Sequence, residues 1–245
     1  MAMSDRGAER MSERFDYVRP IRPRFFPVQE KVPESIHHLE LRTALYQLLR
    51  FFLKGRAVVG SDQFMYYDAS NPKACLAPDV YLRLGSGNTD ITSWKTWERG
   101  TPELAIEITS RSDAPDEPWE NKLARYHQLG VRELLRFDRL SARLRVWDYV
   151  DGDLCERRLL PNTAVPCTVL GLWWVVVPHE QWGSSLRLAY DAQGRELVKS
   201  ELEAETEARQ QEAEARRLAE GLKEQAEARV CELEAELLRL RGDKP

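Results

Sequence analysis

The feature that most constrains this chain is its C-terminal segment, where the character of the sequence changes at about residue 195. From there to Pro245 the segment has no other proline and is dominated by Glu, Ala, Arg and Leu. This composition is typical of a long helix. We therefore expect three parts: an N-terminal arm over residues 1–33, a folded domain over 34–194, and a helix over 195–245.

The apolar residues of the C-terminal segment recur with a period of about eleven. The first members of successive repeats are Leu197, Ala208, Ala219 and Val230. A period of eleven gives 3.67 residues per turn and predicts a straight or slightly right-handed coiled coil. The repeat is rich in alanine until residues 233–240, where pairing should be firmest. We expect this helix to join two copies of the chain as a homodimer; the alternative is a single charged helix without a partner.

The negative charge of the chain is concentrated in the same segment. Residues 195–245 hold 10 Lys and Arg against 14 Asp and Glu, while residues 1–194 hold 26 of each. The folded part therefore has no net charge, and any contact with nucleic acid must come from a local basic patch.

The cysteine pattern and the apolar runs bear on the compartment. Four cysteines lie far apart and include no CxxC pair: Cys75, Cys155, Cys167 and Cys231. This spacing argues against a zinc site or a disulfide framework and favours a reducing compartment. The first 17 residues contain no apolar signal segment, and the most apolar run, residues 168–178, is about half a membrane span. We expect a soluble, cytoplasmic protein without membrane contact.

The N-terminal arm and the first helix differ sharply in pattern. Residues 1–33 carry four prolines among arginines and predict an extended or disordered arm. The segment "SIHHLELRTALYQLLRFFLKG" then shows apolar residues three to five positions apart. Ser35 can cap its N-terminus, and Gly55 can end it in the left-handed conformation.

The rest of the domain alternates between strand and helix patterns. Strand-like segments cover 57–68, 79–84, 103–109, 133–138 and 143–149, and a helix is expected from Pro118 to Leu129, closed by Gly130. Residues 154–194 predict further β structure. The order α-β-β-β-α-β-β indicates an α/β (α+β) fold, with a mixed sheet flanked by helices.

One strand carries an acid where an apolar residue is expected. In "PELAIEITSRSDAPDEPWENKLARY", Leu104, Ile106 and Ile108 face one side of a strand, and Glu107 faces the other. A buried carboxylate costs several kcal/mol unless it is paired, hydrogen-bonded or bound to metal. Glu107 could simply lie on a polar face.

A second acid supports a different interpretation. Asp79 follows Pro78 at the start of another strand, and Lys122 lies on the helix after Glu107. Two acids on adjacent strands can hold a divalent cation, and Mg²⁺ favours one or two carboxylates with water completing its coordination.

Several segments in a fixed order resemble the Uma-two family of restriction-endonuclease-like proteins, a branch of the PD-(D/E)XK nuclease superfamily. The likeness covers roughly residues 33–190. It rests on "VPESIHHLEL", "APDV", "PELAIEITSRS", "LGVREL", "RLRVWD", "LGLWW" and "LRLAYDAQGREL". The resemblance implies a restriction-endonuclease-like fold and a metal-dependent endonuclease that hydrolyses phosphodiester bonds, with DNA as its partner.

The resemblance also implies roles for individual residues. Asp79, Glu107 and the backbone carbonyl of Ile108 would hold Mg²⁺ or Mn²⁺, and the catalytic residues would be Asp79, Glu107 and Lys122. The lysine of the usual motif would stand two residues after Glu107, where this chain has Thr109. In the resembled family that lysine has moved to the following helix, and Lys122 matches its place.

Other residues near these positions are weaker candidates. Tyr126 lies one turn after Lys122 on the same helix face and either belongs to the site or only packs. The first helix offers candidates for extra metal or water contacts: Glu34, His37, His38 and Glu40. Adjacent histidines cannot share a helix face, so at most one points inward. His38 matches the family's position best, with a structural hydrogen bond as the alternative.

The segment between the strand and the helix departs from the family's pattern. Relatives have Ser-x-Ser-Thr after the acid and an Asp four residues before the lysine. Here Asp113 stands in place of the Thr, and Pro118 occupies the Asp position. This departure supports an alternative function: a catalytically inactive nuclease fold that acts as a scaffold or binding protein and oligomerises through its C-terminal coiled coil.

Overall fold

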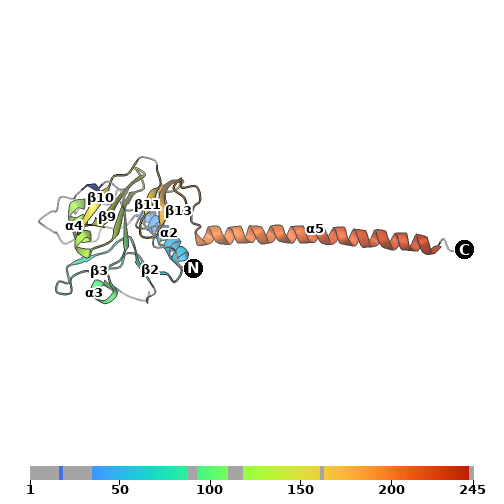
Figure 1. Cartoon of the computed structure of the whole chain (residues 1–245), viewed down its shortest axis with the longest axis horizontal. Coiled ribbons are helices and arrows are strands. Elements are labelled where there is room, and N and C mark those ends of the chain that lie inside the picture. The colour runs from blue at the N-terminus through green and yellow to red at the C-terminus, as the bar shows by residue number, and fades with distance from the viewer. Residues whose placement is uncertain are drawn as a thin grey trace. The chain divides into compact units, whose positions relative to one another are not determined.

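The computed structural model describes residues 17–18, 35–85, 87, 93–109, 118–160 and 163–242. The chain divides into two compact units, Met1–Val198 and Lys199–Pro245 (Figure 1). Most of the expected N-terminal arm lies outside the described residues, as do Glu34 and Asp113.

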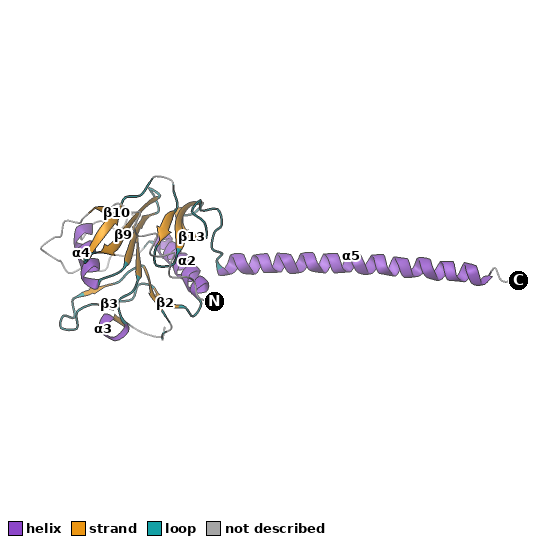
Figure 2. Cartoon of the chain, viewed as in Figure 1, coloured by secondary structure: helices purple, strands orange, loops and turns teal. Residues whose placement is uncertain are grey.

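The first unit is built around a seven-stranded mixed sheet (Figure 2). Its strands, in spatial order, are β1 (Tyr17–Val18), β10 (Asp153–Arg157), β9 (Arg143–Val150), β8 (Glu133–Asp138), β7 (Leu104–Thr109), β5 (Val80–Leu84) and β2 (Ala57–Gly60). Strands β7 and β8 run parallel, and the other neighbouring pairs run antiparallel. The expected mixed sheet is confirmed.

Two small sheets and three helices complete the described part of this unit. One sheet contains β11 (Val165–Cys167), β12 (Leu172–His179) and β13 (Gly183–Ala189), and the other contains β4 (Cys75–Leu76), β3 (Met65–Tyr66) and β6 (Trp94–Lys95). The helices are α2 (Ile36–Leu53), α3 (Thr96–Arg99) and α4 (Trp119–Leu129).

Local signals set the ends of the two longer helices in this unit. The Ser35 side chain caps α2 by accepting the backbone N–H of His38 at 3.3 Å, and Gly55 follows the helix with a φ of 78°. Helix α4 begins after Pro118, and Gly130 closes it in the left-handed conformation with a φ of 77°. Both predicted helices are confirmed.

The large sheet is covered on both faces, which decides the environment of β7. One core joins α2 and the β11–β13 sheet to one side of the large sheet and includes Ile106 and Ile108. The other core joins α4 and the small β3 sheet to the opposite side and includes Ala105 and Tyr126. Residues 104–108 are all buried, so the interpretation that Glu107 lies on an exposed polar face is wrong.

The segment 57–68 is the clearest departure from the sequence prediction. It forms two strands in different sheets, β2 and β3, rather than one. The break lies near Asp62, which has a φ of 50° and donates its N–H to the Pro78 carbonyl at 3.0 Å. Strand periodicity alone does not reveal such a change of sheet.

Among its described residues the second unit forms one long helix, α5 (Glu201–Gly242). The helix begins after the predicted residue 195, and Leu197, the predicted first member of the repeat, instead pairs with Ala189 in an isolated β-bridge. Its large apolar side chains are exposed: Leu202, Leu218, Leu222, Val230, Leu233 and Leu237. Among the described helices, none has both the length and the apolar character needed to cross a membrane.

Candidate active site

Asp79 lies at the bend that precedes β5, beside the end of β7. The β5–β7 ladder pairs Val80 with Ile106, so Ile108 extends beyond it. There the Asp79 carboxylate, rather than the backbone of β5, accepts the N–H of Ile108 at 2.7 Å. The Ser61 hydroxyl donates to the Asp79 backbone carbonyl, also at 2.7 Å. Hydrogen bonds therefore hold both the side chain and the backbone carbonyl of Asp79 in position.

The other oxygen of the Asp79 carboxylate contacts helix α2. Its Oδ1 lies 2.8 Å from the Nε2 atom of His38. His38 is buried, whereas His37 is exposed and lies 3.5 Å from the carboxylate of Glu40. The prediction that at most one of the two histidines points inward is confirmed, and that residue is His38.

Glu107 is the buried acid of the site. It is 4% exposed, because α4 covers this face of β7. The Lys122 ammonium lies 2.6 Å from its Oε2, and the Tyr126 hydroxyl donates to its Oε1. Lys122 and Tyr126 are four residues apart on α4 and therefore share one helix face. Tyr126 thus belongs to the site.

Burial and neighbouring charges shift the pKa values of this group. Burial raises the pKa of Glu107, and the Asp79 carboxylate nearby raises it further, although Lys122 and Tyr126 oppose the shift. Burial lowers the pKa of Lys122, but the carboxylates of Glu107 and Asp79 outweigh it and leave that pKa above its usual value. Burial and Glu107 also raise the pKa of the Tyr126 hydroxyl.

The oxygen atoms available to a cation come from neighbouring strands. In an extended strand the N–H and C=O of one residue point to the same edge. Because the Ile108 N–H bonds Asp79, the Ile108 carbonyl faces the Asp79 side as well. Among the described residues, no group of three or more His, Cys, Asp and Glu side chains is arranged to hold a metal. A cation held by the carboxylates of Asp79 and Glu107 would therefore keep water molecules among its ligands.

The remaining residues near the site have structural contacts. The Thr109 hydroxyl donates to the Phe137 carbonyl at 3.3 Å, and Pro118 precedes the first turn of α4. Arg42 was missed from the sequence: it lies 3.2 Å from Asp62 and 3.5 Å from the Ser61 hydroxyl. Its position four residues after His38 on the same helix face was the available signal.

Comparison with known proteins places the chain in a family. None of the curated proteins matches it. Among solved structures, a match is the crystal structure of a "putative nuclease belonging to DUF820" from Anabaena variabilis ATCC 29413, 14% identical, with a TM-score of 0.41, covering 59% of this chain and 78% of that one. The Uma2 family, described as "Putative restriction endonuclease", matches residues 28–178, more than half of the chain. The chain belongs to the Uma2 (Uma-two) family of restriction-endonuclease-like proteins.

Proposed function

We propose that this protein is a metal-dependent endonuclease that hydrolyses phosphodiester bonds in DNA. The observation that carries the proposal is the meeting of Asp79 and Glu107 at the ends of neighbouring strands, with Lys122 bonded to Glu107. The description of the family as restriction endonucleases supports a nucleic-acid substrate.

The residues present fit Mg²⁺ or Mn²⁺. The donors are the carboxylates of Asp79 and Glu107 and the Ile108 carbonyl, all oxygen atoms, which hard divalent cations prefer. Each carboxylate oxygen already accepts one hydrogen bond but has a second lone-pair site. A cation would also relieve the repulsion between the two acids, which contributes to the raised pKa of Glu107.

When bound, the metal ion polarises a phosphoryl oxygen and lowers the pKa of a coordinated water molecule. The chain's own residues supply the positioning. His38 and the Ile108 N–H orient Asp79, while Tyr126 orients Glu107. The Lys122 side chain is 24% exposed, so its ammonium can reach the attacking water or the charge that develops on the phosphate.

Nicking of supercoiled plasmid DNA tests this function. We expect nicking with Mg²⁺ or Mn²⁺, none with EDTA, and loss to background in Glu107→Gln. Glu120→Gln is the matched control, because Glu120 is an exposed carboxylate on α4 and should leave nicking unchanged. Absence of nicking with either metal, together with no Mn²⁺ uptake in calorimetry, would instead support the scaffold function.

We also propose that α5 joins two copies of the chain. A helix of 42 residues with exposed leucines along it gains stability by burying them against a second helix. Light scattering should give twice the 28.4 kDa mass of one chain, and Leu233→Glu with Leu237→Glu should give the single mass. Wild-type protein of single mass would contradict this assembly.

The four cysteines are free, which fits the proposed cytoplasmic location.

A further inference from the structure

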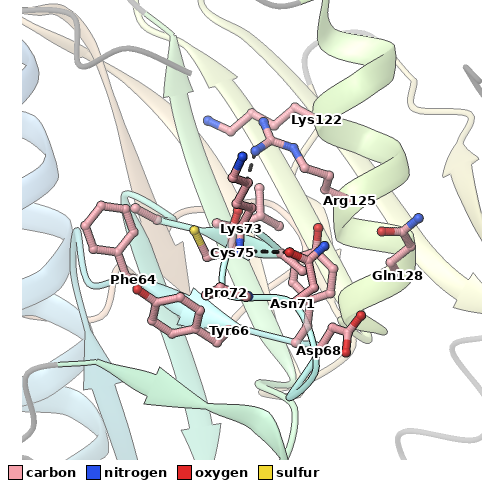
Figure 3. A pocket seen from close by; sticks show the side chains of 14 residues that line it. Phe64, Tyr66, Asp68, Asn71, Pro72, Lys73, Cys75, Lys122, Arg125 and Gln128 are labelled. Carbon is pink, nitrogen blue, oxygen red and sulfur yellow. Dashed lines mark hydrogen bonds between the residues drawn. The ribbon is translucent and has the colours of Figure 1, made fainter. Parts of the chain in front are cut away.

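A cavity of about 770 Å³ lies between helix α4 and the hairpin formed by β3 and β4 (Figure 3). Lys122 lines this cavity and also bonds Glu107. The cavity is therefore next to the candidate active site, with Lys122 between them. Its volume lies within the range of about 300–1,000 Å³ that is usual for small-molecule sites.

The helix side of the cavity carries cations. Lys122, Arg125 and Gln128 follow one another at intervals of three residues and so lie along one face of α4. Arg125 also donates to the Cys75 carbonyl at 3.5 Å, which connects α4 to the hairpin. On this side Lys122 is already paired with Glu107, Arg125 supplies a positive charge, and Gln128 has an amide that can both donate and accept hydrogen bonds.

The hairpin side of the cavity carries aromatic rings and a third cation. Phe64 and Tyr66 lie on either side of the buried Met65, and both line the cavity. Their ring centroids are 6.4 Å apart, and Phe64 is 45% exposed although it is a large apolar residue. Lys73, at the end of the hairpin loop, is exposed beside them.

Exposed aromatic rings among cations are the chemistry that binds an unpaired nucleotide. The rings stack on the face of a base, and the cations hold the adjacent phosphates. In a regular duplex both faces of each base are already stacked on neighbouring bases, so such rings have nothing to contact. The combination of Phe64, Tyr66, Lys73 and Arg125 therefore favours a strand with unstacked bases.

We infer that this cavity binds an unpaired nucleotide of the substrate strand, next to the phosphodiester presented to Glu107 and Lys122. The inference rests on the proposed function and defines its substrate as single-stranded or locally unpaired nucleic acid. The base stacks on Phe64 and Tyr66, Gln128 contacts the base edge, and Lys73 with Arg125 holds phosphate.

Binding without cleavage tests the inference. Fluorescence anisotropy of a labelled oligothymidylate strand, measured with full-length protein in EDTA, reports the Kd directly. We expect Phe64→Ala to weaken binding by roughly 5- to 100-fold, the effect of losing one base–aromatic stack, and Phe64→Trp to restore it. Lys73→Gln should weaken binding and reduce its dependence on salt. Tyr190→Ala removes an equally exposed ring outside the cavity and should bind as wild type does.

The two proposals can fail separately. Unchanged binding by Phe64→Ala and Lys73→Gln, no binding by wild type, or equal affinity for a matched duplex would each overturn the nucleotide site, whatever the nicking assay shows. If the strand binds and the variants weaken it while Mg²⁺ and Mn²⁺ support no cleavage, the nucleotide site stands and the nuclease proposal fails.

Discussion

Two groups of buried charges occupy different places in the same unit, and they are built differently. The first joins Glu133 on β8, Asp148 on β9 and Arg157 on β10. Arg157 Nε and Nη2 each donate to Asp148 at 2.5 Å, and Nη2 lies 3.4 Å from Glu133. The Trp174 indole and the Thr168 N–H also donate to Glu133, at 3.2 and 2.7 Å. We call these three charged residues the closed cluster.

The candidate active site also has two acids and one strong cation, but that cation is less deeply buried. Glu107 is paired with Lys122, which is partly exposed, and Asp79 lies 2.8 Å from the Nε2 atom of His38. In the closed cluster the arginine is inaccessible, and donors reach the acids from the β11–β13 sheet as well as from Arg157. The comparison indicates that burial of charge alone does not mark a functional site. What distinguishes the candidate active site is a cation that is partly exposed to solvent.

The largest expected effect is on the closed cluster. Arg157→Leu leaves Glu133 and Asp148 buried without a cation, which should lower the free energy of unfolding by about 3–5 kcal/mol. Urea denaturation measures it. Arg145→Leu is the matched control, because Arg145 pairs with Glu156 where both side chains are about 30% exposed, and its cost should be under about 1 kcal/mol. Equal losses of unfolding free energy in the two variants would show that the buried cation stabilises the chain no more than the partly exposed one does.

A smaller effect is expected at the site. Lys122→Met removes the cation from Glu107 and should cost about 2–3 kcal/mol, below the cost at the closed cluster because Lys122 is partly exposed. In a Glu107→Gln background the same substitution should cost much less. A double-mutant cycle by urea denaturation in EDTA measures the coupling. Additive losses would show that the two side chains do not interact.

The hydrogen bond from α2 to the site should have a smaller effect again. His38→Ala removes the partner of Asp79 Oδ1 and should cost about 1–2 kcal/mol. Thermal unfolding measures the loss, with His37→Ala as control because His37 is exposed on the adjacent position of the same helix. The prediction fails if both variants melt at the same temperature.

The smallest effect is a dependence of stability on pH. The pKa of Glu107 is raised above its ordinary 4.5 by burial and by Asp79, so the folded chain binds this proton more tightly than the unfolded chain. In EDTA the contribution of Glu107 is therefore full below pH 4.5 and is lost as pH rises toward the folded pKa, by at most about 1.4 kcal/mol per pH unit. Urea midpoints should show this loss in wild type and not in Glu107→Gln; identical pH profiles would exclude it.

Much of the fold could be predicted from local patterns. The helices over 36–53 and 119–129 follow from apolar spacing and from the signals at Ser35, Gly55 and Gly130. The strand 133–138 has the predicted bounds. The single strand predicted over 57–68 was wrong, because strand periodicity does not show which sheet a segment joins.

The site could be predicted in part, since family resemblance and residue types selected Asp79, Glu107 and Lys122. Alternation along β7 placed Glu107 opposite Ile106 and Ile108, but it could not show that α4 covers that face. The bond from His38 to Asp79 spans 41 residues, and the bond from Lys122 to Glu107 spans 15. The sequence shows that these residues can donate and accept hydrogen bonds, but it does not show that the two partners of each bond lie close together.

The sequence by itself determined where the helices over 36–53 and 119–129 and most strands of the large sheet form, because apolar period, caps and turn residues act over a few neighbouring positions. It also showed two acids and a lysine in the order that the family resemblance implies for a metal site. Only the tertiary structure decided that Glu107 is buried, that His38 rather than His37 reaches Asp79, and that Arg157 contacts two acids while Lys122 pairs with Glu107. These outcomes depend on how helices and sheets pack across the chain, and packing between distant segments is not a local property of the sequence.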